Sequence, residues 1–103
     1  MKYMRFRTDY PKLKKKEFTT IRKNSVGKYI GHDVLCTTPT RAPFVAMIYD
    51  IKKMRLCDMS DEFLMQDTCT KTRAAAIALL NSFYDGPINP NIYMYVFYLR
   101  RKL

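Results

Sequence analysis

The segment Ile92–Leu99 constrains the fold most, because aromatic and aliphatic side chains alternate along it without a charged residue. Alternation with a period of two predicts a strand, and an apolar strand of this kind suits the centre of a sheet. The same reasoning predicts further strands at Lys2–Arg7, Thr19–Arg22, His32–Thr38 and Phe44–Ile51, the last of which can continue past a bend to Leu56. The chain is therefore expected to be built around a sheet.

The expected helices are short and lie mostly late in the chain. They begin near Asp9-Tyr10-Pro11, at Ser60-Asp61-Glu62, and at Thr70 or Thr72 ahead of the alanine- and leucine-rich segment Arg73–Tyr84. Ser60 can cap free main-chain amides, and the glycine of Asp85-Gly86-Pro87 is expected to end the last helix. Dominant strands followed by grouped helices predict an α+β fold, a small and strongly curved sheet or barrel with helices packed at one end.

Composition limits the class of protein. A length of 103 residues with 48% hydrophobic residues suits one compact domain over residues 1–103. The three cysteines are widely spaced and His32 is the only histidine, so we expect no metal site, no disulfide framework and no cofactor. Reduced cysteines and the lack of an apolar run of ~20 residues indicate a cytoplasmic protein without a membrane span.

Positive charge is concentrated at the start of the chain. The net charge is +10, and residues 1–30 contain ten lysines and arginines against two acids. A second basic group, Arg100-Arg101-Lys102, follows the last expected strand. This distribution favours a nucleic-acid partner, through phosphate contacts and counterion release. The alternative is a solvated face that keeps a small protein dissolved.

The candidate ligand-binding residues lie in the segment where the basic run meets a strand. They are Lys14, Lys15, Lys16, Glu17, Thr20, Arg22 and Lys23. Arginine and lysine suit phosphate oxygens, and Thr20 can add a polar contact or act as a nucleophile. Glu17 can pair with Arg22 or accept a hydrogen bond from the amino group of a cytosine.

Two other groups of residues can be explained either by ligand binding or by a purely structural role. Tyr93, Tyr95 and Tyr98 can stack on bases or simply belong to the sheet. His32 can lie near a ligand-binding cleft, but a lone histidine is more often structural than catalytic.

The chain resembles the ASCH domains of the PUA-like superfamily of small β-barrels. The matching segments are Lys14–Arg22, which ends in Thr20-Ile21-Arg22, then Gly31-His32-Asp33-Val34, Ala46–Ile51 with Met54-Arg55-Leu56, Asp58–Glu62 and Ile92–Leu99. The resemblance implies a PUA-like β-barrel with helices at one end, and a basic cleft that binds nucleic acid, RNA above all.

Within that family the chain looks most like small amidohydrolases that deacetylate N4-acetylcytidine. The resemblance places the catalytic threonine on Thr20 and the later proton carrier on Asp67. These amidohydrolases also use a catalytic lysine. At its position this chain has Glu17, whose carboxylate cannot replace an ammonium, and Lys16 lies one position away. The first hypothesis is therefore an RNA-binding domain. The alternatives are an amidohydrolase acting through Thr20, Lys16 and Asp67, and a basic protein-interaction module.

Overall fold

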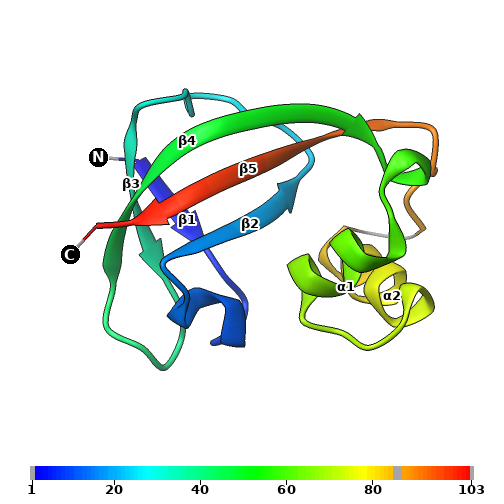
Figure 1. The fold of residues 1–103 in the computed structure, drawn as a ribbon, viewed down its shortest axis with the longest axis horizontal. Coiled ribbons are helices and arrows are strands. Elements are labelled where there is room, and N and C mark those ends of the chain that lie inside the picture. The colour runs from blue at the N-terminus through cyan, green and yellow to red at the C-terminus, as the bar shows by residue number, and fades with distance from the viewer. Residues whose placement is uncertain (1, 85–86, 103) are drawn as a thin grey trace.

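The computed structural model describes residues 2–84 and 87–102 and shows a small α+β domain (Figure 1). The strands are β1 (Lys2–Arg5), β2 (Glu17–Arg22), β3 (Asp33–Thr37), β4 (Phe44–Arg55) and β5 (Tyr93–Arg101). The helices are the 3-10 turns η1 (Pro11–Lys14) and η2 (Leu56–Asp58) and the α-helices α1 (Asp61–Thr68) and α2 (Arg73–Phe83). Among the described residues, none of the helices has the length and apolar character needed to cross a membrane.

The five strands form one open, mixed sheet in the order β1-β3-β4-β5-β2. Only β1 and β3 are parallel, and the other three pairings are antiparallel. The expected β-barrel is wrong, because β1 and β2 remain the two edges of the sheet and no strand pairing joins them. β1 has four residues, all paired with β3, and β2 pairs along its length with β5, so each of these strands has one unpaired edge.

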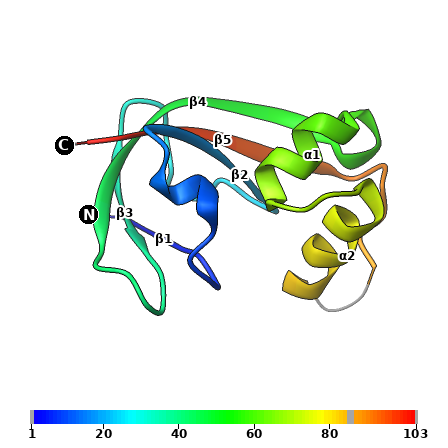
Figure 2. The same ribbon diagram turned by 60° about the horizontal axis from the view of Figure 1, so that its bottom comes forward.

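The sheet curls around a first hydrophobic core. This core takes buried side chains from all five strands, including Met4, Phe18, Val34, Ile48 and Phe97. Figure 2 shows the long, curved ribbon of β4 that accompanies this curl. A β-bulge between Ile48 and Asp50 shifts the register of β4 against β5, and such bulges increase local bending and twist.

A second core lies between the sheet and the helices. Ile21 of β2 and Val96 of β5 pack there against Leu64 of α1 and Leu80 of α2. Figure 1 shows α1 and α2 together at one end of the sheet, under the ends of β4, β5 and β2. The strand β2 therefore contributes to both cores, and its end lies where sheet and helices meet.

The expected elements are present with shifted boundaries. Ser60 accepts a hydrogen bond from the amide of Phe63, and Thr72 accepts one from the amide of Ala75, so Thr72 rather than Thr70 opens α2. β4 runs unbroken through Lys52-Lys53 to Arg55. The expected end of the last helix at Asp85-Gly86 lies outside the described residues.

Candidate functional site

A cavity of about 480 Å³ lies between the ends of β1 and β2 and the C-terminal end of α2. Its lining residues are Arg5, Phe6, Arg7, Thr20, Ile21, Arg22, Pro39, Phe83 and Tyr84. The volume falls within the range of ~300–1,000 Å³ typical of small-molecule sites. Three arginines and three aromatic rings therefore surround one space large enough for a nucleotide-sized ligand.

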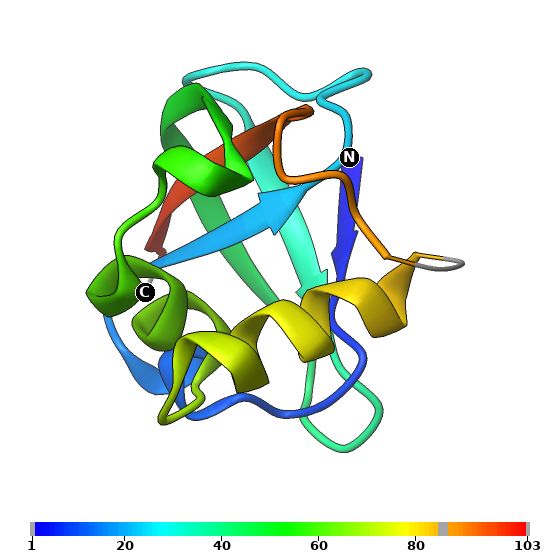
Figure 3. The same ribbon diagram turned by 90° about the vertical axis from the view of Figure 1, so that its right-hand side faces the viewer.

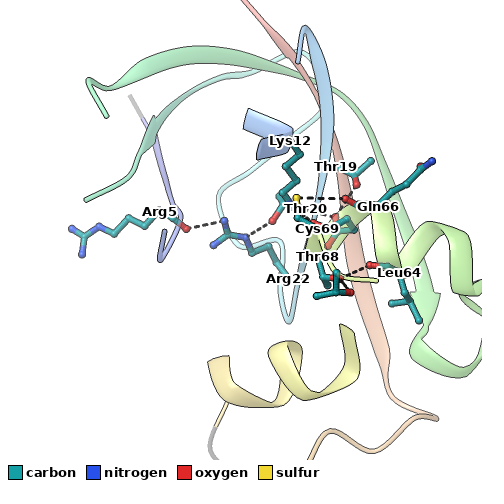
Figure 4. A network of polar contacts seen from close by, with 11 residues as sticks. Arg5, Lys12, Thr19, Thr20, Arg22, Leu64, Gln66, Thr68 and Cys69 are labelled. Atoms are coloured by element: carbon teal, nitrogen blue, oxygen red, sulfur yellow. Dashed lines mark hydrogen bonds and ion pairs between the residues drawn. The ribbon is translucent and has the colours of Figure 1, made fainter. Parts of the chain in front are cut away.

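Arg22 is held in place by three contacts. Its Nε donates to the hydroxyl of Thr20 at 3.1 Å, and its Nη2 donates to the main-chain oxygen of Arg5 at 2.8 Å. Its guanidinium also lies 5.0 Å from the centre of the Phe6 ring. Figure 4 shows Arg22 between Arg5 and Thr20. These contacts leave Nη1 and part of Nη2 free to donate to a ligand.

Arg7 is fixed at the end of α2. Its Nη2 donates to the main-chain oxygen of Ser82 at 3.1 Å, its Nη1 contacts the Ser82 hydroxyl at 3.3 Å, and its guanidinium lies 4.6 Å from the Phe83 ring centre. A cation at the C-terminal end of a helix is stabilised by the free carbonyls and the helix dipole. Figure 3 views the molecule from the end at which α1 and α2 lie.

The arginines of this cavity differ from most others in the chain. Outside the cavity, Arg41, Arg55, Arg73 and Arg100 each pair with a carboxylate. Arg5, Arg7 and Arg22 have no carboxylate partner among the described residues. Arg7 and Arg22 therefore bring two positive charges without a carboxylate partner to the cavity, where they attract an anion, whereas the side chain of Arg5 extends away from Arg22 (Figure 4).

Burial changes the pKa of two groups in the cavity wall. Burial lowers the pKa of the Arg22 guanidinium, and nearby Tyr84 and Asp67 partly offset the effect. Arginine nevertheless stays protonated under physiological conditions because its intrinsic pKa is so high. Burial also raises the pKa of the Tyr84 hydroxyl, which therefore stays neutral and available as a hydrogen-bond donor.

A second polar cluster lies on the other side of β2. The Nζ of Lys12 donates to the main-chain oxygen of Asp67 at 2.5 Å and lies 3.5 Å from its Oδ1. The hydroxyl of Thr19 donates to the same Oδ1 at 2.7 Å. Lys12 and Asp67 are buried, and the Lys12 ammonium also lies near the rings of Phe6 and Tyr10.

Burial dominates the acid–base properties of this cluster. It raises the pKa of Asp67, although Lys12 and Thr19 act in the opposite direction, and it lowers the pKa of Lys12 against the pull of Asp67. A smaller cavity of about 220 Å³ reaches Lys12 and Thr19, with Lys15, Glu17, Tyr49 and Tyr98 also in its wall.

The structure brings only some of the predicted site residues together. Thr20 and Arg22 are hydrogen-bonded in the large cavity, and the Nζ of Lys23 lies 5.1 Å from the ring centre of Tyr84 in its wall. Lys14, Lys15 and Lys16 are exposed. Asp67 contacts Thr19 and Lys12, while the described contacts do not join it to Thr20 or Lys16.

Glu17 has a different partner from the one considered above. Its carboxylate pairs with Arg100 at 2.8 Å, because Glu17 and Arg100 face each other in the β2–β5 register. Glu17 therefore does not pair with the guanidinium group of Arg22.

Sequence reasoning missed Arg5, Arg7 and Lys12 as site residues. Arg5 and Arg7 carried a signal, since they belong to the basic N-terminal third, but nothing local indicated which end of the sheet they reach. Lys12 stands beside an exposed lysine run and is distinguished from it only by its place in the 3-10 turn η1, next to buried Leu13.

Within residues 2–84 and 87–102, no group of three or more histidine, cysteine, aspartate or glutamate side chains is arranged to hold a metal ion. Comparison of the chain with protein-family models, curated proteins and solved structures finds no match.

Proposed function

We propose that the arginine-lined cavity binds RNA, with a phosphate on the guanidinium groups and an unstacked base against the aromatic side chains. The observation that carries this proposal is that Arg7 and Arg22 line one cavity, with Arg5 also in its wall, and have no carboxylate partner among the described residues. Guanidinium groups bind phosphate oxygens through paired hydrogen bonds, which makes arginine the preferred residue at such sites.

The remaining lining residues suit a nucleoside. Phe6, Phe83 and Tyr84 provide apolar and aromatic surface, and single-stranded RNA is commonly recognised by stacking of unpaired bases on such rings. The Tyr84 and Thr20 hydroxyls offer polar contacts in the same wall. The net charge of +10 adds long-range attraction to any polyanion. The short segments that resemble ASCH domains, above all Thr20-Ile21-Arg22, support the same class of ligand.

Fluorescence anisotropy with single-stranded and structured RNA tests this proposal. We expect the logarithm of the association constant to fall linearly with the logarithm of the salt concentration, because phosphate contacts release counterions. Arg22→Met should lower the affinity by about tenfold or more, because hydrogen bonds to charged groups contribute roughly 1.5–3 kcal/mol.

Arg101→Met is the matched control. Arg101 also donates to a main-chain oxygen, that of Leu13 at 2.7 Å, and lies 4.1 Å from an aromatic ring centre, that of Phe44, but it does not line the cavity. Both variants lose one positive charge. An equal loss of affinity in the two variants would show that only net charge matters, and absence of salt-dependent binding at low ionic strength would overturn the proposal.

A second candidate function is hydrolysis of an acylated nucleoside such as N4-acetylcytidine, and one observation favours it. The Thr19 hydroxyl donates to the Asp67 carboxylate at 2.7 Å beside the Lys12 ammonium. A carboxylate with a raised pKa suits proton acceptance from an attacking hydroxyl.

Incubation with N4-acetylcytidine followed by chromatography for cytidine tests this candidate. Turnover that disappears in Thr19→Ala and persists in Thr20→Ala would assign the nucleophile to Thr19. The reverse result would assign it to Thr20, and no release of cytidine by the unaltered protein would exclude this reaction.

A further inference from the structure

Exposed apolar side chains gather on β1 and on the loop of residues 23–32 that follows β2. Six large hydrophobic residues are exposed in the described chain, and four of them lie here: Tyr3 at 59%, Val26 at 79%, Tyr29 at 61% and Ile30 at 59%. A cluster of this kind commonly marks a binding surface. We name these four side chains, together with Lys2, Lys23 and Lys28, the loop surface.

The loop is held in a defined shape rather than left free. The amide of Gly31 donates to the carbonyl of Ile48 at 2.7 Å, and the amide of Ile48 donates back to His32 at 2.9 Å. Gly27 and Gly31 have φ angles of 72° and 91°, which residues with a side chain rarely adopt. The Tyr29 ring packs edge-on against His32, with 5.3 Å between ring centres.

The loop lies against β1. A methyl group built on Gly27 would come within 2.9 Å of the Lys2 Nζ, so the loop and the first residue of β1 are in close contact. Figure 3 shows the loop after β2 passing beside the start of β1. An open hollow of about 630 Å³, lined by Lys2, Gly31, His32 and Asp33, adjoins this contact, and its one acid, Asp33, is paired with Lys102.

The loop surface continues from the arginine-lined cavity. Lys23 begins the loop and lies over Tyr84 in the cavity wall, while Arg5 of β1 lines the same cavity. Lys2, Lys23 and Lys28 have no carboxylate partner among the described residues. Lysines without a carboxylate partner and exposed aromatic rings therefore lie on the two segments, β1 and the loop, that adjoin the cavity.

We propose that the loop surface binds the part of a single-stranded RNA that extends beyond the nucleotide in the cavity. Tyr29 supplies a stacking surface for a base, and Lys23, Lys28 and Lys2 contact the neighbouring phosphates. Aromatic side chains interleaved with cations are the usual means of binding single strands without sequence preference. The inference rests on the proposed function, since the cavity anchors the strand.

The test compares ligands of different length. Uridine monophosphate should occupy the cavity alone, whereas 5′-phosphorylated oligouridines of two, four and eight nucleotides should also reach the loop surface. Binding is measured for the monophosphate by nuclear magnetic resonance titration and for the oligomers by anisotropy. We expect affinity to rise with length and then level off once the loop surface is covered.

Variants of the exposed loop separate the two sites. Tyr29→Ala should weaken binding of the octamer by about tenfold, as expected for loss of one stacked base, and leave binding of the monophosphate unchanged. Tyr29→Phe keeps the ring and should behave like the unaltered protein. Lys2→Gln with Lys28→Gln should reduce the salt slope for the octamer by about 0.7 for each lysine.

Each outcome supports or overturns one specific statement. Monophosphate binding without a gain from length, or octamer binding that Tyr29→Ala does not change, would overturn this inference and leave the proposed function standing. Absence of binding by monophosphate and oligomers alike would overturn the proposed function itself. Binding to anionic phospholipid vesicles that requires Tyr29, with oligouridine binding independent of it, would assign the loop surface to a membrane and overturn the RNA path.

Discussion

The guanidinium of Arg22, at the end of β2, donates a 2.8 Å hydrogen bond to the main-chain oxygen of Arg5, the last residue of β1. These two residues belong to opposite edges of the sheet. One side chain therefore connects edges that no strand pairing joins, and the same side chain lines the candidate binding cavity. Stability of the open sheet and binding of a ligand are coupled at this group.

Ligand binding should stabilise the fold through Arg22. We expect uridine monophosphate to raise the melting temperature of the unaltered protein, because a ligand that binds only the folded state shifts the unfolding equilibrium. Arg22→Lys should reduce this shift, since an ammonium cannot contact Thr20, Arg5 and a phosphate with one fork of donors. Thermal denaturation at increasing ligand concentration measures this rise in melting temperature for both proteins. A shift of equal size in Arg22→Lys would contradict the proposed role of the guanidinium.

Replacement of Lys12 should be costly and should depend on pH. Lys12→Met leaves the buried Asp67 carboxylate without its ammonium, and breaking a buried ion pair in this way costs about 3 kcal/mol or more of unfolding free energy. The pKa of Asp67 is already raised by burial and should rise further in the variant. A protonated Asp67 carries no charge. The loss of unfolding free energy in Lys12→Met relative to the unaltered protein should therefore be largest near neutral pH and should shrink as pH falls through the pKa of Asp67.

Urea denaturation between pH 4 and pH 8 measures this difference. Lys12→Met with Asp67→Asn is the control, because the amide oxygen can still accept from Thr19 and no buried charge remains. We expect the double variant to be more stable than Lys12→Met near neutral pH. A deficit of Lys12→Met that grows as pH falls would contradict the assignment.

The three cysteines should react at different rates. Cys36 is buried in the first core, and burial raises the pKa of its thiol to about 12, whereas Cys57 and Cys69 are exposed. The thiolate is the reactive form, so alkylation of Cys36 should require opening of the sheet. Mass spectrometry after timed iodoacetamide treatment should show two fast modifications and one slow one, with the slow one accelerated by urea. Labelling of Cys36 as fast as Cys57 in native buffer would show that the first core is not closed.

The cap of α2 should contribute measurably to stability. Thr72→Ala removes the hydroxyl that accepts from the amide of Ala75 at 3.0 Å, and loss of such a cap costs about 1 kcal/mol. Chemical denaturation should show this loss. Thr8→Ala is the matched control, since Thr8 is exposed and contributes only its main-chain oxygen to the described hydrogen bonds. Equal effects of the two substitutions would show that the cap is unimportant.

Local signals in the sequence predicted most elements but not how the sheet ends. Alternation identified β5, and the caps at Ser60 and Thr72 follow from residue type at a helix start. Closure of a sheet depends on whether its edge strands are long enough and free to pair, which no local pattern records. Here β1 has only four residues, and its last residue, Arg5, meets β2 through the Arg22 side chain instead of a strand pairing.

The site was predicted only where neighbours in sequence are also neighbours in space. Thr20 and Arg22 lie on one side of β2 and contact each other, as their spacing suggests. The partner of Glu17 is Arg100, and the partner of Lys12 is Asp67, each far away in the chain. Those pairs depend on strand register and helix docking, so an adjacent lysine run gave no information about which lysine is buried.

The strand order also determines when the domain can assemble during synthesis. β5 is synthesised after β2 and β4, yet it lies between them and pairs with both. Until β5 has been synthesised, β2, which carries Thr20 and Arg22, has no neighbour in the sheet, and its amides bond to water. Pairing of β2 in the sheet therefore waits until residues 93–101 have been synthesised, whereas β1 and β3 can pair earlier.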